Sequence, residues 1–229
     1  MNKIDQNLKI IVDILNKEKI FYWIGQGSLL GIKRDNKLIE WDHDIDICVW
    51  HEDNSREEII EILEKEGFNY RKDLEISDIS EQMSFDKKGG RRVDINFYQK
   101  GKTAEGEKIA FIKWTIPKNF LMQIIDAISY SDTYDSKFKI VIRRLKFLKP
   151  LANFFKKILI RKNFFYRKAG YQQPLNLLNE FTVIDFYNLK LNVPSQSEEY
   201  LEYLYGSDWR VPKRRFSWWK VKNLKKDYD

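Results

Sequence analysis

Hydrophobic residues in the first third of the chain are spaced as in alternating helices and strands. Over residues 3–18 they recur every three or four positions, which is typical of an amphipathic helix. The run 21–24 is short, apolar and aromatic, as in a buried strand, and glycines then interrupt it. The predicted elements are a helix over 3–18, a strand over 21–24, a short helix over 29–33, a strand over 45–50 and a helix over 55–66.

The rest of the chain adds further strands and two helical stretches. Val93, Ile95 and Phe97 alternate with polar residues, so residues 92–98 are predicted to form a strand with one apolar face. Pro150 interrupts a helical stretch over 137–166. The remaining predicted elements are strands over 68–71, 79–85, 109–114 and, more weakly, 183–191, and a helix over 197–205 that is capped by Ser195 or Ser197 and ends at Gly206.

Composition indicates a globular protein with a substantial core. Of 229 residues, 43% are hydrophobic and 15% aromatic, so one domain over 1–229 is the expected organisation. The only cysteine, Cys48, lies in an apolar run and is expected in the core, which excludes a disulfide framework. The N-terminus lacks the apolar core of a signal peptide, and no run of about 18 apolar residues is present. We therefore expect a cytoplasmic location, with peripheral binding to the inner face of the membrane.

The net charge of +7 comes from one segment. Twelve Lys and Arg residues and no Asp or Glu lie between Ser136 and Gly170, which leaves 29 basic against 34 acidic residues elsewhere. Interleaved apolar residues make 137–168 a basic amphipathic helical insertion. Such a helix can lie on an anionic membrane surface. Two alternatives stay open: a helix packed on the sheet with a solvated basic face, and a nucleic-acid-binding helix.

The clearest chemical signal is the row Asp42, Asp44 and Asp46. Side chains alternate along a strand, so these three share one face, and residues two apart lie roughly 6.7 Å from each other. Carboxylates at that spacing can hold one hard divalent cation or bracket two. The alternative is an exposed acidic end of a strand.

Asp94 is the candidate third carboxylate. It lies on the polar face of the predicted strand over 92–98, from which it can complete a metal site. The alternative is a solvated residue on an open sheet face. Asp73, Asp78 and Asp86 are competing candidates, although they lie near predicted turns, where Asp is common for local reasons.

A Gly27-Ser28 turn precedes the acidic row. A glycine lets a phosphate approach the backbone, and the start of the following helix attracts anions. The Ser28 hydroxyl adds a donor. Lys33 and Arg34 follow and can neutralise a diphosphate, Arg34 through a bidentate contact. Their alternative role is ordinary surface charge.

Two blocks resemble the signature of the LicD/fukutin-type phosphotransferases. The sequence FYWIGQGSLLGIKR over 21–34, followed by IEWDHDIDI over 39–47, is similar to the family pattern of an apolar strand, G-[TS]-L-L-G-x-x-R, a loop and W-D-x-D-x-D. Many relatives have Asp where this chain has His43. The second block resembles the family's closing P…YL…YG…W…P segment, in Val193-Pro194, Tyr200-Leu201, Tyr205-Gly206 and Trp209 to Pro212.

The resemblance implies an α+β, nucleotidyltransferase-like fold, in which a small mixed sheet is flanked by helices. It implies Mg²⁺ or Mn²⁺ on Asp44 and Asp46, with Asp94 as the third metal ligand. Gly27, Ser28, Arg34 and Lys33 would then lie at the donor phosphates. The general base is left open between Asp94 and Asp42.

The implied reaction moves a phospho-alcohol, such as phosphocholine or ribitol phosphate, from a CDP-activated donor to a sugar hydroxyl. The acceptor would be a glycan or lipid-linked glycan of lipopolysaccharide, capsule or teichoic acid, with residues 174–229 on the acceptor side. A nucleotidyltransferase that adds a nucleoside monophosphate to a small molecule or RNA would use the same residues. The third hypothesis is a non-catalytic basic protein that binds nucleic acid, although the acidic row argues against nucleic acid as the partner.

Overall fold

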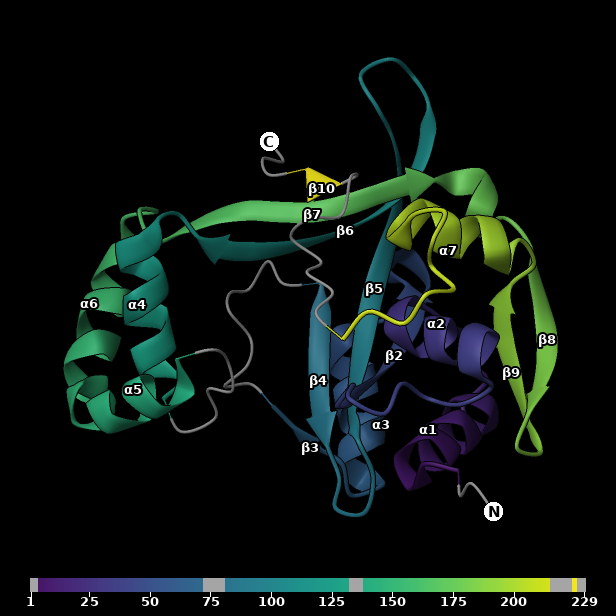
Figure 1. The fold of residues 1–229 in the computed structure, drawn as a ribbon, viewed down its shortest axis with the longest axis horizontal. Helices are drawn as coiled ribbons and strands as arrows, with labels where there is room; N and C mark the ends of the chain where they lie inside the picture. Colours follow the sequence, from purple (N-terminus) through teal and green to yellow (C-terminus); the bar gives the residue numbers. More distant parts are fainter. Residues whose placement is uncertain (1–3, 72–80, 132–137, 215–223, 226–229) are drawn as a thin grey trace. The chain divides into compact units, whose positions relative to one another are not determined.

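The protein was analysed as a computed structural model, which describes residues 4–71, 81–131, 138–214 and 224–225. The chain divides into two compact units (Figure 1). Unit 1 comprises Met1–Trp114 and Gly170–Lys225, and unit 2 comprises Thr115–Ala169 with Lys226–Asp229. The single-domain assignment over 1–229 stays a prediction.

A mixed sheet forms the centre of unit 1. Its strands are β1 (Trp23–Ile24), β2 (Asp44–Trp50), β5 (Arg92–Lys102), β4 (Gln82–Asp86) and β3 (Asn69–Tyr70). The strands β2 and β5 run parallel, whereas β1 pairs antiparallel with β2 and β4 pairs antiparallel with β5. The parallel pair matters most, because its register places Asp46 beside Asp94.

The sheet continues through long strands. The second half of β5 pairs antiparallel with β6 (Lys108–Pro117), and the sheet order then runs through β7 (Tyr166–Pro174) to β10 (Leu224–Lys225). Both β6 and β7 pass from one unit into the other. A separate hairpin joins β8 (Phe181–Phe186) to β9 (Leu189–Pro194), and its turn residues Tyr187 and Asn188 have positive φ, as tight hairpin turns require.

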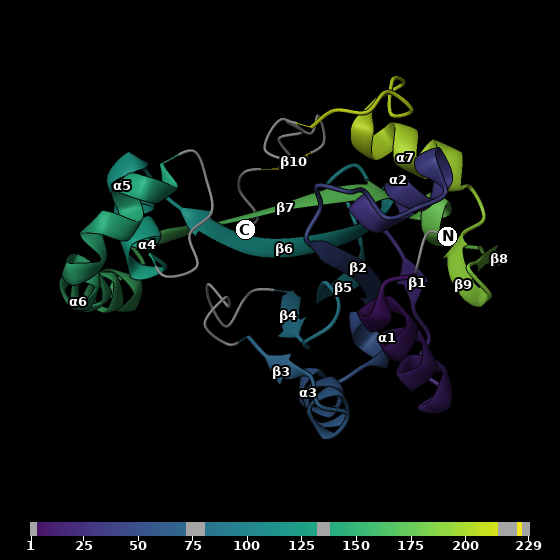
Figure 2. The same ribbon diagram turned by 60° about the horizontal axis from the view of Figure 1, so that its bottom comes forward.

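Helices cover both faces of the central strands. In Figure 2, α1 (Gln6–Lys17) and α3 (Arg56–Lys65) lie below the strands, and α2 (Gln26–Asp35) and α7 (Ser197–Tyr205) lie above them. The side chains of Asp5 and Ser55 cap α1 and α3 by accepting backbone N–H bonds. The described part of unit 1 also contains the short 3-10 segments η1 (His51–Asp53) and η4 (Leu175–Leu178).

Burial follows from this layering. Ile45, Ile47 and Val49 of β2 are fully buried, and so are Asn96 and Tyr98 on the face of β5 that was predicted to be polar. Cys48 is buried and free, as predicted. Asp44 and Asp46 lie at the start of β2, and Asp94 lies beside them on β5.

Unit 2 is helical. It contains α4 (Phe120–Ser129), α5 (Lys139–Arg144), η3 (Leu145–Leu148) and α6 (Lys149–Arg161), with Pro150 in the first turn of α6, where it costs no hydrogen bond. The side chain of Lys156 pairs with Asp126 at 2.9 Å, and the Tyr166 hydroxyl donates to the same carboxylate. This polar cluster ties α6 to α4.

The structure confirms most predicted elements and corrects several. The helical stretch over 137–166 ends at Arg161, because the chain enters β7 at Tyr166, so the basic segment 137–168 is not helical throughout. The single weak strand over 183–191 is a hairpin, and Gln196 rather than Ser195 or Ser197 caps α7. Helix α4 was not predicted. The part of the strand over 79–85 that precedes Glu81 lies outside the described residues.

No helix in the described part of the chain is both long and apolar enough to cross a lipid bilayer.

Candidate active site

Helix α2 begins directly beside the end of β2. Gly25 is its N-cap residue and provides no side-chain cap. Ser28 instead links α2 to β2: its amide donates to Asp46 Oδ2 at 3.2 Å, and the Asp46 amide donates to Ser28 Oγ at 2.8 Å. Gly27 and Ser28 therefore lie in the first turn of α2 and not in a turn before it. Ser28 is buried, and its predicted contact with a donor phosphate stays a prediction.

Gly27 is required by the close approach of the acidic row. A Cβ at this position would lie 2.8 Å from Asp42 Oδ2 and 3.3 Å from Asp46 Oδ2. The first distance is shorter than real Cβ contacts, so any side chain would push Asp42 away. Glycine thus lets the positive end of the helix dipole approach two carboxylates.

Asp94 is held in place by three side chains. Its oxygens accept hydrogen bonds from Ser84 at 2.7 Å, Gln82 at 3.0 Å and Arg92 at 2.9 Å. Arg92 also donates to Asp44 Oδ2 at 2.6 Å, so one guanidinium bridges Asp44 and Asp94. The structure brings Asp42, Asp44, Asp46 and Asp94 into one cluster, as the sequence predicted, and places Arg92 inside it.

Burial and mutual repulsion raise the pKa of the clustered carboxyl groups. Burial, reinforced by the neighbouring charge of Asp44, raises the pKa of Asp42 to about 7. The pKa of Asp46 is raised well above its usual value, first by burial and then by Asp44, Asp94 and Asp42. Burial also raises the pKa of Asp94 to about 6, although Arg92 opposes the shift. Simultaneous ionisation of these carboxyl groups is therefore disfavoured unless a cation compensates their charge.

A hard cation suits this donor set chemically, because several carboxylates face one another with one arginine between them. In the arrangement described, however, no three His, Cys, Asp or Glu side chains within 4–71, 81–131, 138–214 and 224–225 form a preformed metal site. A cation shared by Asp44 and Asp94 would compete with Arg92 for both carboxylates. Metal binding by Asp44, Asp46 and Asp94 stays a prediction.

A cavity of about 270 Å³ opens beside the cluster. Asp42 and Asp46 line it on the acidic side, and Arg34 contributes a cation from α2. Lys33 is exposed and is not among the lining residues, so only Arg34 of the predicted pair faces the cavity. Arg34 is also held by a bidentate pair with its neighbour Asp35.

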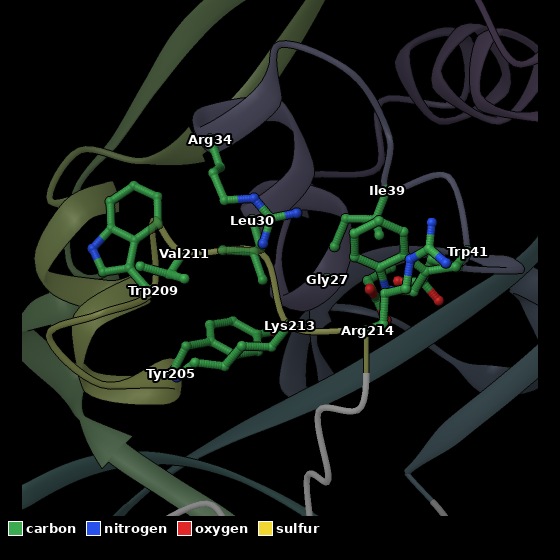
Figure 3. A pocket seen from close by; sticks show the side chains of 12 residues that line it. Gly27, Leu30, Arg34, Ile39, Trp41, Tyr205, Trp209, Val211, Lys213 and Arg214 are labelled. Carbon is green, nitrogen blue, oxygen red and sulfur yellow. The ribbon is translucent and has the colours of Figure 1, made fainter.

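The C-terminal segment supplies the opposite wall. Figure 3 shows Trp209 and Tyr205 on one side of the cavity and Trp41 with Arg214 on the other. The Arg214 guanidinium lies 5.5 Å from the centre of the Trp41 ring, and Lys213 also lines the space. Cations and aromatic rings therefore surround the mouth of an acidic cavity.

Helix α7 positions this wall. Tyr200 is fully buried, and its hydroxyl accepts a hydrogen bond from the Gln26 amide at the start of α2. A Cβ on Gly25 would lie 2.5 Å from Cys48 Sγ and 3.2 Å from the same hydroxyl, so α2, β2 and α7 meet around a glycine. Both sequence blocks of the predicted family signature thus meet at one site.

A second, open and polar hollow adjoins the cluster. Arg91, Arg92, Glu40 and His43 are among the residues that line it. Asp42 lines this hollow as well as the cavity, whereas Asp94 lines neither. Asp42 therefore lies between the cavity and the open polar hollow.

Sequence reasoning missed Arg92, Trp41, Tyr205, Trp209 and the two C-terminal cations as site residues. The position of Arg92, two residues before Asp94 on the same strand face, was the available signal. Of the competing acids, Asp86 pairs with Arg71 near the end of β4. Asp73 and Asp78 lie outside the described residues.

Comparison with known families confirms the resemblance. Residues 19–127 match the LicD/FKTN/FKRP nucleotidyltransferase domain. Ribitol 5-phosphate transferase FKRP of Homo sapiens and of Mus musculus is 29% identical over 76 residues, which are 31% of this chain and 15% of each FKRP chain. An uncharacterized protein of Rickettsia prowazekii is 38% identical over 64 residues, 28% of this chain and 24% of its own. The chain thus spans a small part of these relatives.

Solved structures with a similar arrangement are more distant. The lincosamide adenylyltransferase LnuA, bound to lincomycin, has a TM-score of 0.42 at 14% identity and covers 86% of this chain and 85% of its own. The antibiotic-resistance factor ANT(2'')-Ia has a TM-score of 0.32 at 17% identity, with coverage of 69% and 90%. The family match, which suggests a transferase of phosphate-containing groups acting on glycans, therefore carries the functional argument.

Proposed function

We propose that this protein is a metal-dependent phosphotransferase that moves a phospho-alcohol from a CDP-activated donor to a sugar hydroxyl of a glycan. The observation that carries the proposal is the cluster of Asp42, Asp44 and Asp46 at the start of α2, beside a cavity lined by cations and aromatic rings. The family match over residues 19–127 and the similarity to FKRP support it.

The cavity suits the donor. Arg34, Lys213 and Arg214 supply positive charge for a diphosphate, and the half-buried Trp41 supplies a flat surface on which a pyrimidine ring can stack. Gly27 brings the N-terminal end of α2 to the same space, where the helix dipole favours negative charge. A nucleoside diphosphate linked to an alcohol combines these features.

The open polar hollow suits the acceptor, because sugar hydroxyls bind polar side chains exposed to water. Asp42 lies between the two spaces, so we assign it as the general base. Asp94 lines neither space and already accepts hydrogen bonds from Ser84, Gln82 and Arg92, so it is less suited than Asp42 to take the proton of the acceptor.

In the proposed step, the acceptor oxygen attacks the phosphorus that carries the alcohol. The bond from this phosphorus to the bridging oxygen breaks, CMP leaves, and Asp42 takes the hydroxyl proton. Arg34 and Arg214 stabilise the charge that develops on the leaving phosphate. Additional neutralisation would come from Mg²⁺ or Mn²⁺ held by Asp44 and Asp46, with Asp94 as the third carboxylate.

Thermal shift and nucleotide release test this function. The protein is incubated with Mg²⁺ or Mn²⁺ and with CDP-choline, CDP-ribitol, nucleotide sugars or nucleoside triphosphates. We expect a CDP-alcohol to raise the melting temperature only with metal, and to release CMP when a sugar acceptor is present. The Asp46→Asn variant should lose both responses, while Asp185→Asn, an exposed residue on β8, should keep them.

Other outcomes would replace the proposal. Stabilisation by triphosphates with release of pyrophosphate, and a product mass increased by a nucleotide, would identify a nucleotidyltransferase. The absence of any metal-dependent response across the panel would contradict the catalytic assignment.

A further inference from the structure

Most of the exposed large hydrophobic residues in the described part of the chain lie in unit 2. Of the fifteen large hydrophobic residues that are exposed in the described part of the chain, eleven belong to unit 2, although it is about a quarter of the protein. They are Phe120, Leu121, Phe138, Ile140, Val141, Phe147, Leu151, Phe154, Phe155, Ile160 and Phe164. Soluble proteins rarely gather so many exposed apolar side chains in one place without a partner.

The internal core of the three helices is correspondingly small. Among the described residues, its buried hydrophobic cluster consists of Ile128, Ile142 and Ala152, and five half-buried residues pack against it: Ile124, Ile125, Ala127, Leu145 and Leu148. The pair between Lys156 and Asp126 adds a polar tie within this core. The helices therefore hold together around few residues while their outer apolar side chains remain in water.

The exposed residues follow the geometry of an amphipathic helix. On α6, Leu151, Phe154 and Phe155 are exposed and Ile158 is half-buried, at the spacing i, i+3, i+4 and i+7. These positions form one stripe along the helix. Phe147 of η3 precedes Leu151 in the chain and is 75% exposed, so it extends the stripe. We call Phe147, Leu151, Phe154 and Phe155 the apolar stripe.

Cations flank the apolar stripe. On a helical wheel with 100° per residue, Arg161 falls beside Phe154 and Lys157 falls farther round on the same side, while Lys162 directly follows the last residue of α6. Arg143 and Arg144 lie at the end of α5, just before η3. All five are exposed, and residues 136–170 contain no Asp or Glu. Long cationic side chains beside exposed Phe and Leu are typical of helices in a lipid interface.

We propose that the helices of unit 2 dock onto an anionic lipid surface, with the apolar stripe inserted among the acyl chains and the flanking cations at the headgroups. Charge complementarity favours lipid over a protein partner, because the exposed cations of residues 138–168 lie in a segment without a single acid, which matches a uniformly negative surface. The aliphatic residues Ile140, Val141 and Leu151 favour lipid over nucleic acid, since they cannot stack on bases.

Co-sedimentation of the full-length protein with vesicles tests this docking. Vesicles of phosphatidylcholine with phosphatidylglycerol are compared with phosphatidylcholine alone at low and high salt. We expect binding to the anionic vesicles, weakened by salt, and much weaker binding to neutral ones. The proposal does not depend on catalysis, so Asp46→Asn should bind equally well.

Two variants separate the apolar and electrostatic contributions. Replacing the four residues of the apolar stripe with Ser should lower vesicle affinity at least about tenfold. Replacing Arg143, Arg144, Lys157 and Arg161 with Gln should lower it about fivefold per cation at low salt. The matched controls are Val183→Ser for the apolar set and Gln at the exposed Lys9, Lys65, Lys88 and Lys108 for the cations.

The proposal fails if anionic vesicles do not bind the protein at low salt, or if both variants bind as well as the parent. A dimer that disappears in the Ser variant, without vesicle binding, would identify a second copy as the occupant instead. Tighter binding to RNA or single-stranded DNA than to vesicles would identify nucleic acid.

Discussion

Ser28 and Asp46 form a reciprocal pair of hydrogen bonds across 18 positions of sequence. The Asp46 amide donates to Ser28 Oγ at 2.8 Å, and the Ser28 amide donates to Asp46 Oδ2 at 3.2 Å. One bond fixes the end of β2 to α2, and the other orients the carboxylate that faces the cavity. Ser28 of the predicted Gly27-Ser28 motif thus fixes the position of the Asp46 carboxylate.

Replacing Ser28 with Ala tests this pair. The variant leaves the buried Asp46 amide without its acceptor, which should cost about 1–3 kcal/mol in the free energy of unfolding. We expect CMP release to fall by more than tenfold, because the Asp46 carboxylate loses its fixed position. Urea unfolding and CMP release measure the two effects. A Ser129→Ala control removes a similarly buried hydroxyl in unit 2, and unchanged turnover in Ser28→Ala would contradict the assignment.

Arg34 and Lys33 are adjacent cations with different placements. Arg34 lines the cavity, and Lys33 is exposed outside it. Arg34→Ala should therefore weaken binding of the CDP-alcohol at least about tenfold, since a charge-assisted contact to phosphate is lost. Lys33→Ala should change affinity less than twofold. Isothermal titration calorimetry measures both, and equal effects would show that only general charge matters.

The sequence predicted the site in parts. Alternation placed Asp42, Asp44 and Asp46 on one face, and the same rule placed Asp94 on the polar face of its strand. That these two strands are neighbours depends on the parallel register of Asp46 with Asp94, which periodicity does not encode. Arg92 went unnoticed because a charged residue beside a turn looks like ordinary surface until the partner strand is known.

Long-range contacts account for the other omissions. Trp209 and Arg214 reach the cavity from the far end of the chain, through the packing of α7 against α2. Helix α4 was missed although Ile124, Ile125 and Ile128 recur at helical spacing along it. A local pattern cannot show that an apolar face remains uncovered.

Arg92 is the charge partner of Asp44 and Asp94. Arg92→Gln should lower the free energy of unfolding by about 1–3 kcal/mol, because two carboxylates lose their compensating cation. If the carboxylates bind metal, Mg²⁺ or Mn²⁺ should raise the melting temperature of this variant more than that of the parent. Differential scanning fluorimetry with and without metal measures this. Arg71→Gln, which removes the partner of Asp86, is the control, and an equal metal response in all three proteins would contradict a shared site.

Glu81 gives a pH dependence separate from the site. Its carboxylate accepts from the Lys113 amide at 2.7 Å and from Gln99 at 2.5 Å, and burial raises its pKa from 4.5 to about 7. A raised pKa in the folded state means that this group stabilises the fold fully below pH 4.5, and that the contribution is lost as the pH rises through 7.

Glu81→Gln cannot ionise, so its stability relative to the parent should improve by about 1–2 kcal/mol between pH 5 and pH 8, allowing for partial solvent screening. Urea unfolding at both pH values measures the difference, with Glu107→Gln as an exposed control. A difference that stays constant with pH would show that Glu81 ionises as readily in the folded chain as in the unfolded one.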